Sequence, residues 1–200
     1  GFHGVVRIVH TPNHRGCKGT EYIIQAVEQL QRENLKVNLI LLEKIQNEEV
    51  REILFNDADI LVEQLISTGH GLSALEGMAT GIATISNLED ETYTLPMRRW
   101  SFLNECPLVS ATPENITDVL RFLVTNPDLR MELGRAGRNY VEKYHGLDSA
   151  QYLFKNVFDY IYGKKDSIIN LYHPILGEYP NRLPKIVHPL KKNRISGVEY

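Results

Sequence analysis

The stretch "HTPNHRGCKGTEY", residues 10–22, has a composition that could bind an anion. Arg15 and Lys18 supply two cations, and Gly16 and Gly19 let the backbone come close to a ligand. An apolar run precedes the stretch and helical periodicity follows it, so its backbone N–H groups should lie at a helix N-terminus, which favours anions. Arginine can also form paired hydrogen bonds to phosphate oxygens. The stretch therefore predicts a diphosphate site, although GxxxxGK[ST] and GxGxxG are both absent, and a solvated loop with a turn glycine is the alternative.

A second turn of this character lies in "STGHGLSALEGMATGIATIS", residues 67–86. Gly69 and Gly71 flank His70 directly after an apolar run, and the apolar residues that follow have the spacing of a short helix. Glu76 falls about one turn inside that helix. A carboxylate there could accept hydrogen bonds from both hydroxyls of a ribose, as acidic residues do in other nucleotide-binding α/β folds. An ordinary exposed helical glutamate is the alternative and the commoner fate of this residue type.

The composition predicts one soluble globular domain with an appendage. The chain has 200 residues, of which 42% are hydrophobic and 24% charged, and its net charge of −3 argues against bulk nucleic-acid binding. Its apolar runs are shorter than the roughly 18 residues that a membrane-spanning helix needs, so we expect no transmembrane segment. No secretion pattern is present at the N-terminus, so we expect a cytoplasmic location, and peripheral contact with the inner membrane stays open. Cys17 and Cys106 lie far apart and indicate a reduced compartment. Because the first expected strand starts within a few residues of Gly1, we expect a piece of a longer protein.

Apolar runs alternate with helical periodicity along the first half of the chain. The expected strands cover residues 5–9, 37–42, 58–66, 82–85 and 107–111. Between them we expect one helix with Thr20 as its N-cap and another over residues 47–55, capped by Asn47. This alternation predicts an α/β fold, a Rossmann-like parallel sheet flanked by helices. The carboxyl ends of its strands are where a ligand site is expected.

The second half of the chain is predicted to be helical. Thr112 with Pro113 is a start signal, and Asn126 with Pro127 is another, for a helix that ends near Gly146. A third helix should open at Asp148 or Ser149. The apolar face expected on it consists of Ala150, Leu153, Phe154, Val157 and Ile161.

Beyond Gly163 the sequence is rich in proline and lysine and has no sustained period. We therefore expect residues 1–163 to form the domain and residues 164–200 to form an irregular C-terminal tail, extended or partly ordered. The residues expected to hold this tail down are Ile168, Leu171, Tyr172 and Ile186.

Taken together, the two turns resemble a known family over about residues 5–162. The stretch "GHGLSALEGMATGIATIS" is similar to "GFGLxxLEAMAxGxPVV" in the C-terminal domain of retaining GT-B glycosyltransferases of the glycogen synthase and sucrose synthase-like group, often called family 4. The stretch "HTPNHRGCKGTEYIIQAVEQL" resembles the arginine followed by Lys-Gly at the start of the same domain. The "NDADILV" strand and the downstream "NPDLRMELGRAGRNYVEKY" fit as well.

The resemblance implies roles for particular residues. Lys18 matches the lysine that binds donor phosphate, Arg15 is the nearest match to its arginine partner, and Glu76 matches the second acid of the family's Glu-x7-Glu motif, which holds the ribose. These three are the expected catalytic residues. The expected binding set adds their neighbours in the two turns: Asn13, Gly19, Thr68, Gly69, His70, Gly71, Leu72 and Ser73.

Two departures from the family pattern matter. The first acid of the motif falls at position 68, where this chain has Thr68, and threonine can hydrogen bond but cannot supply a negative charge to the sugar ring. Either Glu63 or His70 compensates, or the domain has lost part of its catalytic competence. Arg15 also lies closer to Lys18 than is usual, yet both leave one flexible loop and can still converge on a diphosphate.

The resemblance implies a retaining hexosyltransferase whose donor substrate is a nucleotide-diphosphate sugar. It further implies a role in polysaccharide or glycoconjugate synthesis, with no metal ion and no cofactor. Negative charge grows on the leaving diphosphate, and fixed cations and helix N–H groups stabilise it most strongly in the transition state. Acceptor binding would come from an N-terminal domain. Two such domains do not fit into 200 residues, so we expect this chain to be the donor-binding half, which binds nucleotide sugar weakly and is inactive alone.

Other interpretations stay open at this point. A degenerate nucleotide-sugar sensor or interaction module fits the threonine at position 68. A nucleotide-sugar 2-epimerase shares the two-domain fold, but "GLSALEGMATG" fits the transferases better. A phosphorelay receiver needs acids after the first strand, whereas Val9 is followed by His10 and Thr11. His10, His14 and His70 have no metal-ligand spacing, so we expect no metal site.

Overall fold

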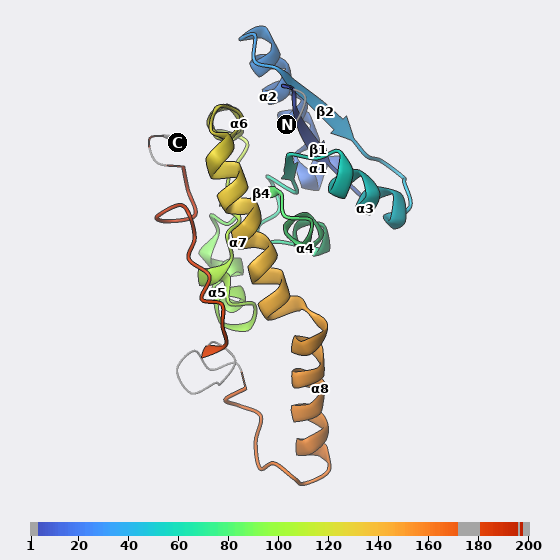
Figure 1. Cartoon of the computed structure of the whole chain (residues 1–200), viewed down its shortest axis with the longest axis vertical. Coiled ribbons are helices and arrows are strands. Elements are labelled where there is room, and N and C mark those ends of the chain that lie inside the picture. The colour runs from blue at the N-terminus through green and yellow to red at the C-terminus, as the bar shows by residue number, and fades with distance from the viewer. Residues whose placement is uncertain (1–3, 172–180, 196, 198–200) are drawn as a thin grey trace.

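A parallel β-sheet forms the centre of the molecule (Figure 1). The computed structural model describes residues 4–171, 181–195 and 197. The sheet has five strands in the order β2-β1-β3-β4-β5. The strands are β1 (Val6–His10), β2 (Val37–Leu41), β3 (Ile60–Val62), β4 (Ala83–Ser86) and β5 (Val109–Ser110). All five coincide with predicted apolar runs, although β3 is much shorter than residues 58–66, and the α/β parallel-sheet prediction is confirmed.

Helices cover both faces of this sheet. The helices of the described chain are α1 (Arg15–Lys18), α2 (Thr20–Arg32), α3 (Asn47–Asn56), α4 (Leu72–Ala79), α5 (Glu91–Trp100), the 3-10 helix η1 (Leu103–Glu105), α6 (Ile116–Thr125), α7 (Pro127–His145) and α8 (Leu147–Ile161). Helices α2 and α6 pack together on one face, while α3 and α4 lie on the other and α7 packs against α4. Side chains that alternate along β1 and β3 therefore enter two different apolar cores, which explains why these strands are continuous apolar runs.

Two predicted helix caps are wrong. Gly19, with φ of 73°, caps α2, and Thr20 is its first helical residue. The Thr20 hydroxyl lies 2.9 Å from Nε2 of His10, so a buried histidine takes the oxygen that would have capped the helix. Helix α3 begins at Asn47 as predicted, but the cap position belongs to Gln46.

Later helix boundaries are a mixture of correct and wrong predictions. Residues 112–113 do not start α6. They lead into a turn in which the Asn115 side chain accepts the backbone N–H of residue 112, and the helix begins at Ile116. Helix α7 has Asn126 at its N-cap and ends at His145 with Gly146 as its C-cap, as predicted.

Helix α5 was not predicted from the sequence. It contains Pro96, and proline disfavours a helix interior, but Asp90 caps the helix by accepting the N–H of Thr92 at 2.9 Å. This helix packs on η1 beside the sheet edge formed by β5.

The described part of the tail lies against the body of the molecule. In Figure 1 it runs alongside α5 and upward beside α6. Ile186 and Ile195 are buried in two different cores, and Leu171 is buried as well. Ile168 is only partly buried. Tyr172, which was also expected to hold the tail, lies outside the described residues.

Helix α8 projects from the body of the domain (Figure 1). Its predicted apolar face is only partly covered by the described chain: Ala150, Leu153 and Val157 are half-buried, whereas Phe154 is 63% exposed and Ile161 is 64% exposed. Phe154, Phe158 and Tyr162 instead form an exposed row of stacked rings. The periodicity of α8 therefore predicts the helix correctly, but two of the five predicted apolar residues stay exposed within the described chain.

Candidate functional site

The two glycine-rich turns lie side by side at the carboxyl ends of β1 and β3. These strands are neighbours, and the strand order reverses between them, so a ligand crevice is expected at this point of the sheet. The backbone joins the turns directly. The N–H of Leu65 donates to the carbonyl of Lys18 and the N–H of Ser67 donates to that of Cys17, each at 3.1 Å.

The first turn contains a single-turn helix, α1, that the sequence analysis treated as loop. His14 caps it by accepting the N–H of Cys17 on Nδ1 at 3.3 Å. Gly19 ends it in the left-handed conformation, and a Cβ there would lie 3.0 Å from the Cβ of Leu65. A glycine is thus required for the two turns to approach each other. Asn13, which was expected to bind ligand, is exposed at the tip of this turn.

The two cations of the first turn point to different partners. Lys18 is mostly buried, and its ammonium lies 2.7 Å from Oε1 of Gln64 and 3.4 Å from Oε1 of Glu63. Arg15 is exposed and pairs with Glu21 at 2.9 Å and Glu43 at 3.1 Å. The structure therefore brings Lys18, but not Arg15, to the second turn, and a phosphate role for Arg15 stays a prediction.

A buried carboxylate, that of Glu63, organises the second turn. Its side chain has no exposed surface. Oε1 accepts the backbone N–H of Gly71 at 2.7 Å and the hydroxyl of Ser73 at 3.1 Å, besides the ammonium of Lys18. Donors from two loops thus converge on one oxygen at the N-terminus of α4. A Cβ on Gly71 would lie 2.8 Å from that oxygen, so only glycine fits this contact without displacing the carboxylate.

A second layer of hydrogen bonds fixes the turn to β4. The carbonyl of Gly69 accepts the Ser86 hydroxyl at 2.6 Å and the Gln64 amide at 3.3 Å, and its N–H donates to the carbonyl of Asn87 at 2.8 Å. Thr68 bridges to Asn87 in parallel register. Gly69 has φ of 90°, in the left-handed region that favours glycine. These bonds leave the turn little freedom, so its N–H groups are preorganised.

His70 is the least satisfied polar side chain of the turn. Both ring nitrogens are buried and have no hydrogen-bond partner of normal geometry among the described residues. Burial lowers the pKa of His70, and the ring meets that of His145 edge-on, with centroids 6.3 Å apart. A neutral imidazole with an unused N–H next to a helix N-terminus is suited to bonding a ligand oxygen.

Glu76 of α4 lies beside residues of α3 and α7. It is partly buried and lines a hollow of about 410 Å³ between α3, α4 and α7. Its neighbours in that hollow include Arg51 and Arg138. Leu72, one helical turn earlier, is 78% exposed. Among the described residues no hydrogen bond or ion pair links Glu76 to the donors around Glu63, and its proposed contact with a ribose stays a prediction.

The remaining histidine of the first stretch is a structural residue. His10 is fully buried, with Nδ1 2.7 Å from the carbonyl of Val62 and Nε2 2.9 Å from the hydroxyl of Thr20. Burial lowers its pKa to about 4, so the ring is neutral and links β1, β3 and α2. Within the described ranges, no three His, Cys, Asp or Glu side chains come together in a way that could hold a metal ion.

Sequence reasoning missed most of the support around the turn. Gln64, Ser86 and Asn87 were not singled out, and Glu63 was considered only as a substitute for the missing acid at position 68. A signal was available. Two polar residues, Glu63 and Gln64, interrupt the apolar run "ILVEQLI", and a buried charge is found almost only where it is paired.

Comparison with solved structures identifies the fold. The chain is similar to the crystal structure of the C-terminal domain of a glycosyl transferase group 1 family protein, LpcC, from Francisella tularensis. The TM-score is 0.52 at 17% sequence identity, and the match covers 71% of this chain and 87% of the other. The sequence matches no protein-family model and no curated protein. The predicted resemblance to the C-terminal domain of a GT-B glycosyltransferase is therefore confirmed at the level of the fold. No helix in the described part of the chain is both long and apolar enough to span a bilayer.

Proposed function

We propose that this chain is the donor-binding domain of a glycosyltransferase, and that it binds the diphosphate of a nucleotide sugar between Lys18 and the turn at residues 69–73. The observation that carries the proposal is the convergence of the Gly71 N–H, the Ser73 hydroxyl and the Lys18 ammonium on one oxygen of Glu63. A set of donors that holds one anionic oxygen in a fold of this kind is suited to hold another.

Lys18 has capacity left for a ligand. An ammonium has three N–H donors, and the described contacts of Lys18 account for two of them, to Glu63 and Gln64. Its side chain retains 15% of its exposure. In the proposed reaction, the sugar–phosphate bond breaks and negative charge accumulates on the leaving diphosphate. Lys18 and the N–H groups at the start of α4 would stabilise that charge without reorganising, which lowers the barrier.

Sugar recognition is assigned to the polar groups beside the phosphate donors. Thr68 cannot supply the charge of the family's first acid, but the Glu63 carboxylate is hydrogen-bonded to the same turn and places a negative charge beside it. The unsatisfied ring of His70 adds a donor for a sugar hydroxyl or a phosphate oxygen. Glu76 would accept the ribose hydroxyls from the hollow beside α3.

The acceptor is proposed to bind to a further domain that this chain does not contain. The exposed aromatic row of α8, formed by Phe154, Phe158 and Tyr162, is the kind of apolar surface that indicates a protein contact. Residues 4–163 contain both turns and the sheet, so we assign donor binding to them and leave the tail as an appendage of this domain.

Calorimetric titration with UDP, GDP and ADP tests the proposal. We expect one of them to bind and Lys18→Ala to weaken that binding by at least about tenfold, as loss of a charge-assisted contact would. Lys36→Ala, which removes an exposed lysine before β2, is the matched control and should change the affinity less than about twofold. Equal affinities for the native chain and Lys18→Ala would remove the phosphate assignment.

One observation favours a second candidate function, a catalytically degenerate nucleotide-sugar-binding module. The donors at the start of α4 are already bonded to an internal carboxylate, and the acid expected at position 68 is a threonine. The two functions differ in sugar recognition. A transferase donor site should bind the nucleotide sugar more tightly than the matching nucleoside diphosphate. Equal affinities for the two would favour the degenerate module.

A further inference from the structure

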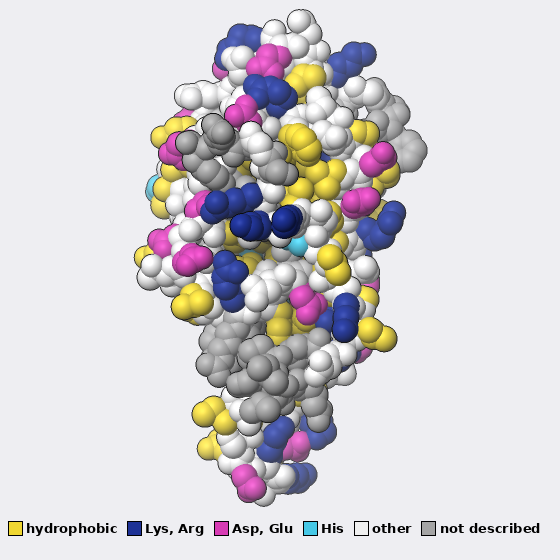
Figure 2. Space-filling model, turned by 90° about the vertical axis from the view of Figure 1, so that its left-hand side faces the viewer, with side chains coloured by type: hydrophobic (Ala, Val, Ile, Leu, Met, Phe, Trp, Pro, Cys, Tyr) yellow, Lys and Arg dark blue, Asp and Glu magenta, His cyan; other side chains and the backbone are white. Residues whose placement is uncertain are grey.

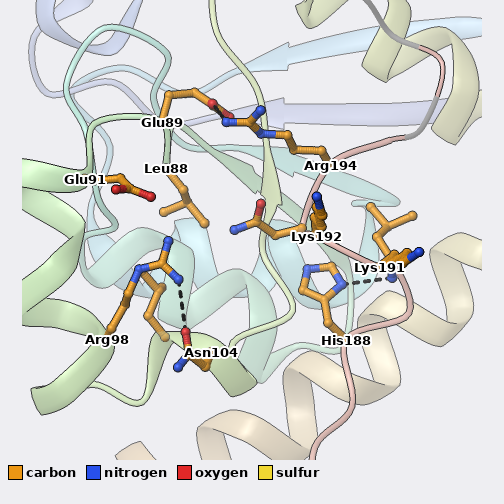
Figure 3. Close-up of a pocket in the computed structure, with 12 residues that line it drawn as sticks. Leu88, Glu89, Glu91, Arg98, Asn104, His188, Lys191, Lys192 and Arg194 are labelled. Atoms are coloured by element: carbon orange, nitrogen blue, oxygen red, sulfur yellow. Dashed lines mark hydrogen bonds and ion pairs between the residues drawn. The ribbon is translucent and has the colours of Figure 1, made fainter.

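A second hollow, strongly cationic, lies at the edge of the sheet formed by β5. It has a volume of about 450 Å³ and is lined by residues that follow β4, by parts of α5 and η1, and by the tail residues 188–194. Figure 3 shows Arg98 on one side of it and Lys191 and Lys192 on the opposite side. In the space-filling view, Lys and Arg side chains gather around a histidine in the middle of this face (Figure 2).

The charges that line this hollow do not balance. The charged residues of its wall are Arg98, Lys191, Lys192, Arg194, Glu89 and Glu91. Arg194 pairs with Glu89, and Arg98 donates to the side-chain carbonyl of Asn104 at 3.0 Å. Lys191 and Lys192 have no ion-pair partner within the part of the chain that the structure describes. The whole chain has a net charge of −3, so the positive charge of this hollow is a local concentration of cations and does not reflect the overall composition.

The backbone that carries the two lysines is held in place on both sides. Nδ1 of His188 accepts the N–H of Leu190 at 2.9 Å, and its Nε2 therefore carries the hydrogen and donates to the carbonyl of Leu108 at 2.9 Å. Burial lowers the pKa of His188, which keeps the ring neutral in this arrangement. The N–H of Ser110 in β5 donates to the carbonyl of Asn193 at 2.7 Å. The lysines thus extend from a fixed turn, which lowers the entropic cost of binding a ligand.

The hollow adjoins the donor turn through α5. Met97 of this helix contacts the donor turn, since a Cβ on Gly69 would lie 2.9 Å from its sulfur. Arg98, the next residue, lines the cationic hollow. The two sites are therefore separate but share one helix.

We infer that this hollow binds a phosphate group, with Lys191 and Lys192 as the principal cations and the Arg98 guanidinium as a hydrogen-bonding fork. Ammonium groups act as compact charges and guanidinium binds phosphate oxygens in pairs, so the combination suits a phosphomonoester or a diphosphate. The group could belong to a soluble phosphorylated molecule or to a phospholipid headgroup, because both present the same oxygens. This inference does not depend on donor binding at residues 69–73.

Nuclear magnetic resonance of the 200-residue chain tests the inference, with inorganic pyrophosphate as the probe. The backbone amides of Leu190 and Asn193 report on this hollow, and the amide of Gly71 reports separately on the donor turn. We expect saturable shifts at Leu190 and Asn193, and at least about tenfold weaker binding there in the double variant K191A/K192A. The matched control is K164A/K165A, which removes another adjacent pair of exposed lysines outside the hollow and should retain the native affinity.

A vesicle experiment identifies the source of the phosphate. We would measure cosedimentation with phosphatidylcholine vesicles that do or do not contain phosphatidylglycerol. Binding to the anionic vesicles that is lost in K191A/K192A but not in K164A/K165A supports the site and assigns it to a lipid headgroup. Pyrophosphate shifts without such vesicle binding support a soluble ligand. If the hollow shows neither response, or if both double variants lose the same affinity, the inference is overturned. Shifts at Leu190 without shifts at Gly71 count against donor binding and not against this site.

Discussion

The substitution Glu63→Gln should strengthen binding of a diphosphate to the donor turn. In the native chain, a carboxylate oxygen already occupies the donors of Gly71, Ser73 and Lys18, at 2.7, 3.1 and 3.4 Å. Glutamine keeps the size of the side chain and one carbonyl oxygen for these donors. Its amide can donate to the hydroxyl of Ser86, which lies 3.2 Å from the second carboxylate oxygen. The variant therefore removes the negative charge and retains most hydrogen bonds.

The size of the effect follows from Coulomb's law. A phosphate that shares these donors would lie about 6 Å from the carboxylate, and two unit charges at that separation repel each other by about 3 kcal/mol at an effective dielectric constant of about 20. Salt and partial exposure of the ligand reduce this value. We therefore expect the affinity for pyrophosphate to rise by about ten- to a hundredfold.

Isothermal titration calorimetry with pyrophosphate measures this gain, and Glu33→Gln is the control. It also removes one negative charge, but Glu33 pairs with Arg121 on α6, away from the donor turn. Urea unfolding would verify that Glu63→Gln stays folded, with a stability change below about 1.5 kcal/mol. An affinity equal to that of the native chain, or a gain of the same size in Glu33→Gln, would refute the idea that Glu63 competes with the ligand for these donors.

Two further substitutions test the proposed ribose contact of Glu76 and the close packing of α7. Glu76→Ala should weaken binding of a nucleoside diphosphate by about tenfold and leave the affinity for inorganic pyrophosphate unchanged, as loss of a ribose contact would. Equal losses of affinity for both ligands in calorimetry would contradict a contact between Glu76 and the ribose. Gly134→Ala should destabilise the fold by about 2–3 kcal/mol, because the new methyl group would lie 1.9 Å from the carbonyl oxygen of Gly81, where α7 meets the end of α4. An unchanged midpoint of urea unfolding would mean that α7 does not pack this closely against residue 81.

The strands were predictable because buried parallel strands are continuous apolar runs. Other elements were missed for different reasons. Helix α5 has Tyr93, Met97 and Trp100 at helical spacing, but Pro96 lies inside it, and proline disfavours a helix interior. The docking of the tail depends on contacts such as that of His188 with Leu108, 80 positions away, and no local pattern encodes them.

The candidate site was predictable in part, for a related reason. Glycines and a lysine in two turns indicated where an anion could bind, and the fold brings those turns together. The direction of long side chains was not predictable. Arg15 reaches Glu43 at the end of β2, whereas Lys18, three positions later, reaches Glu63. Sequence proximity favoured convergence of the two cations, but the acidic neighbours that each meets in the folded chain decide their direction.

The most direct test of the central claim is amide chemical-shift mapping of the native chain with UDP, GDP and ADP. Donor binding predicts that at least one of these nucleotides produces saturable shifts at Lys18, Gly71 and Ser73, whose donors meet at the start of α4. If all three nucleotides leave these amides unchanged, or shift only residues elsewhere such as those of the cationic hollow, the donor-binding function is contradicted.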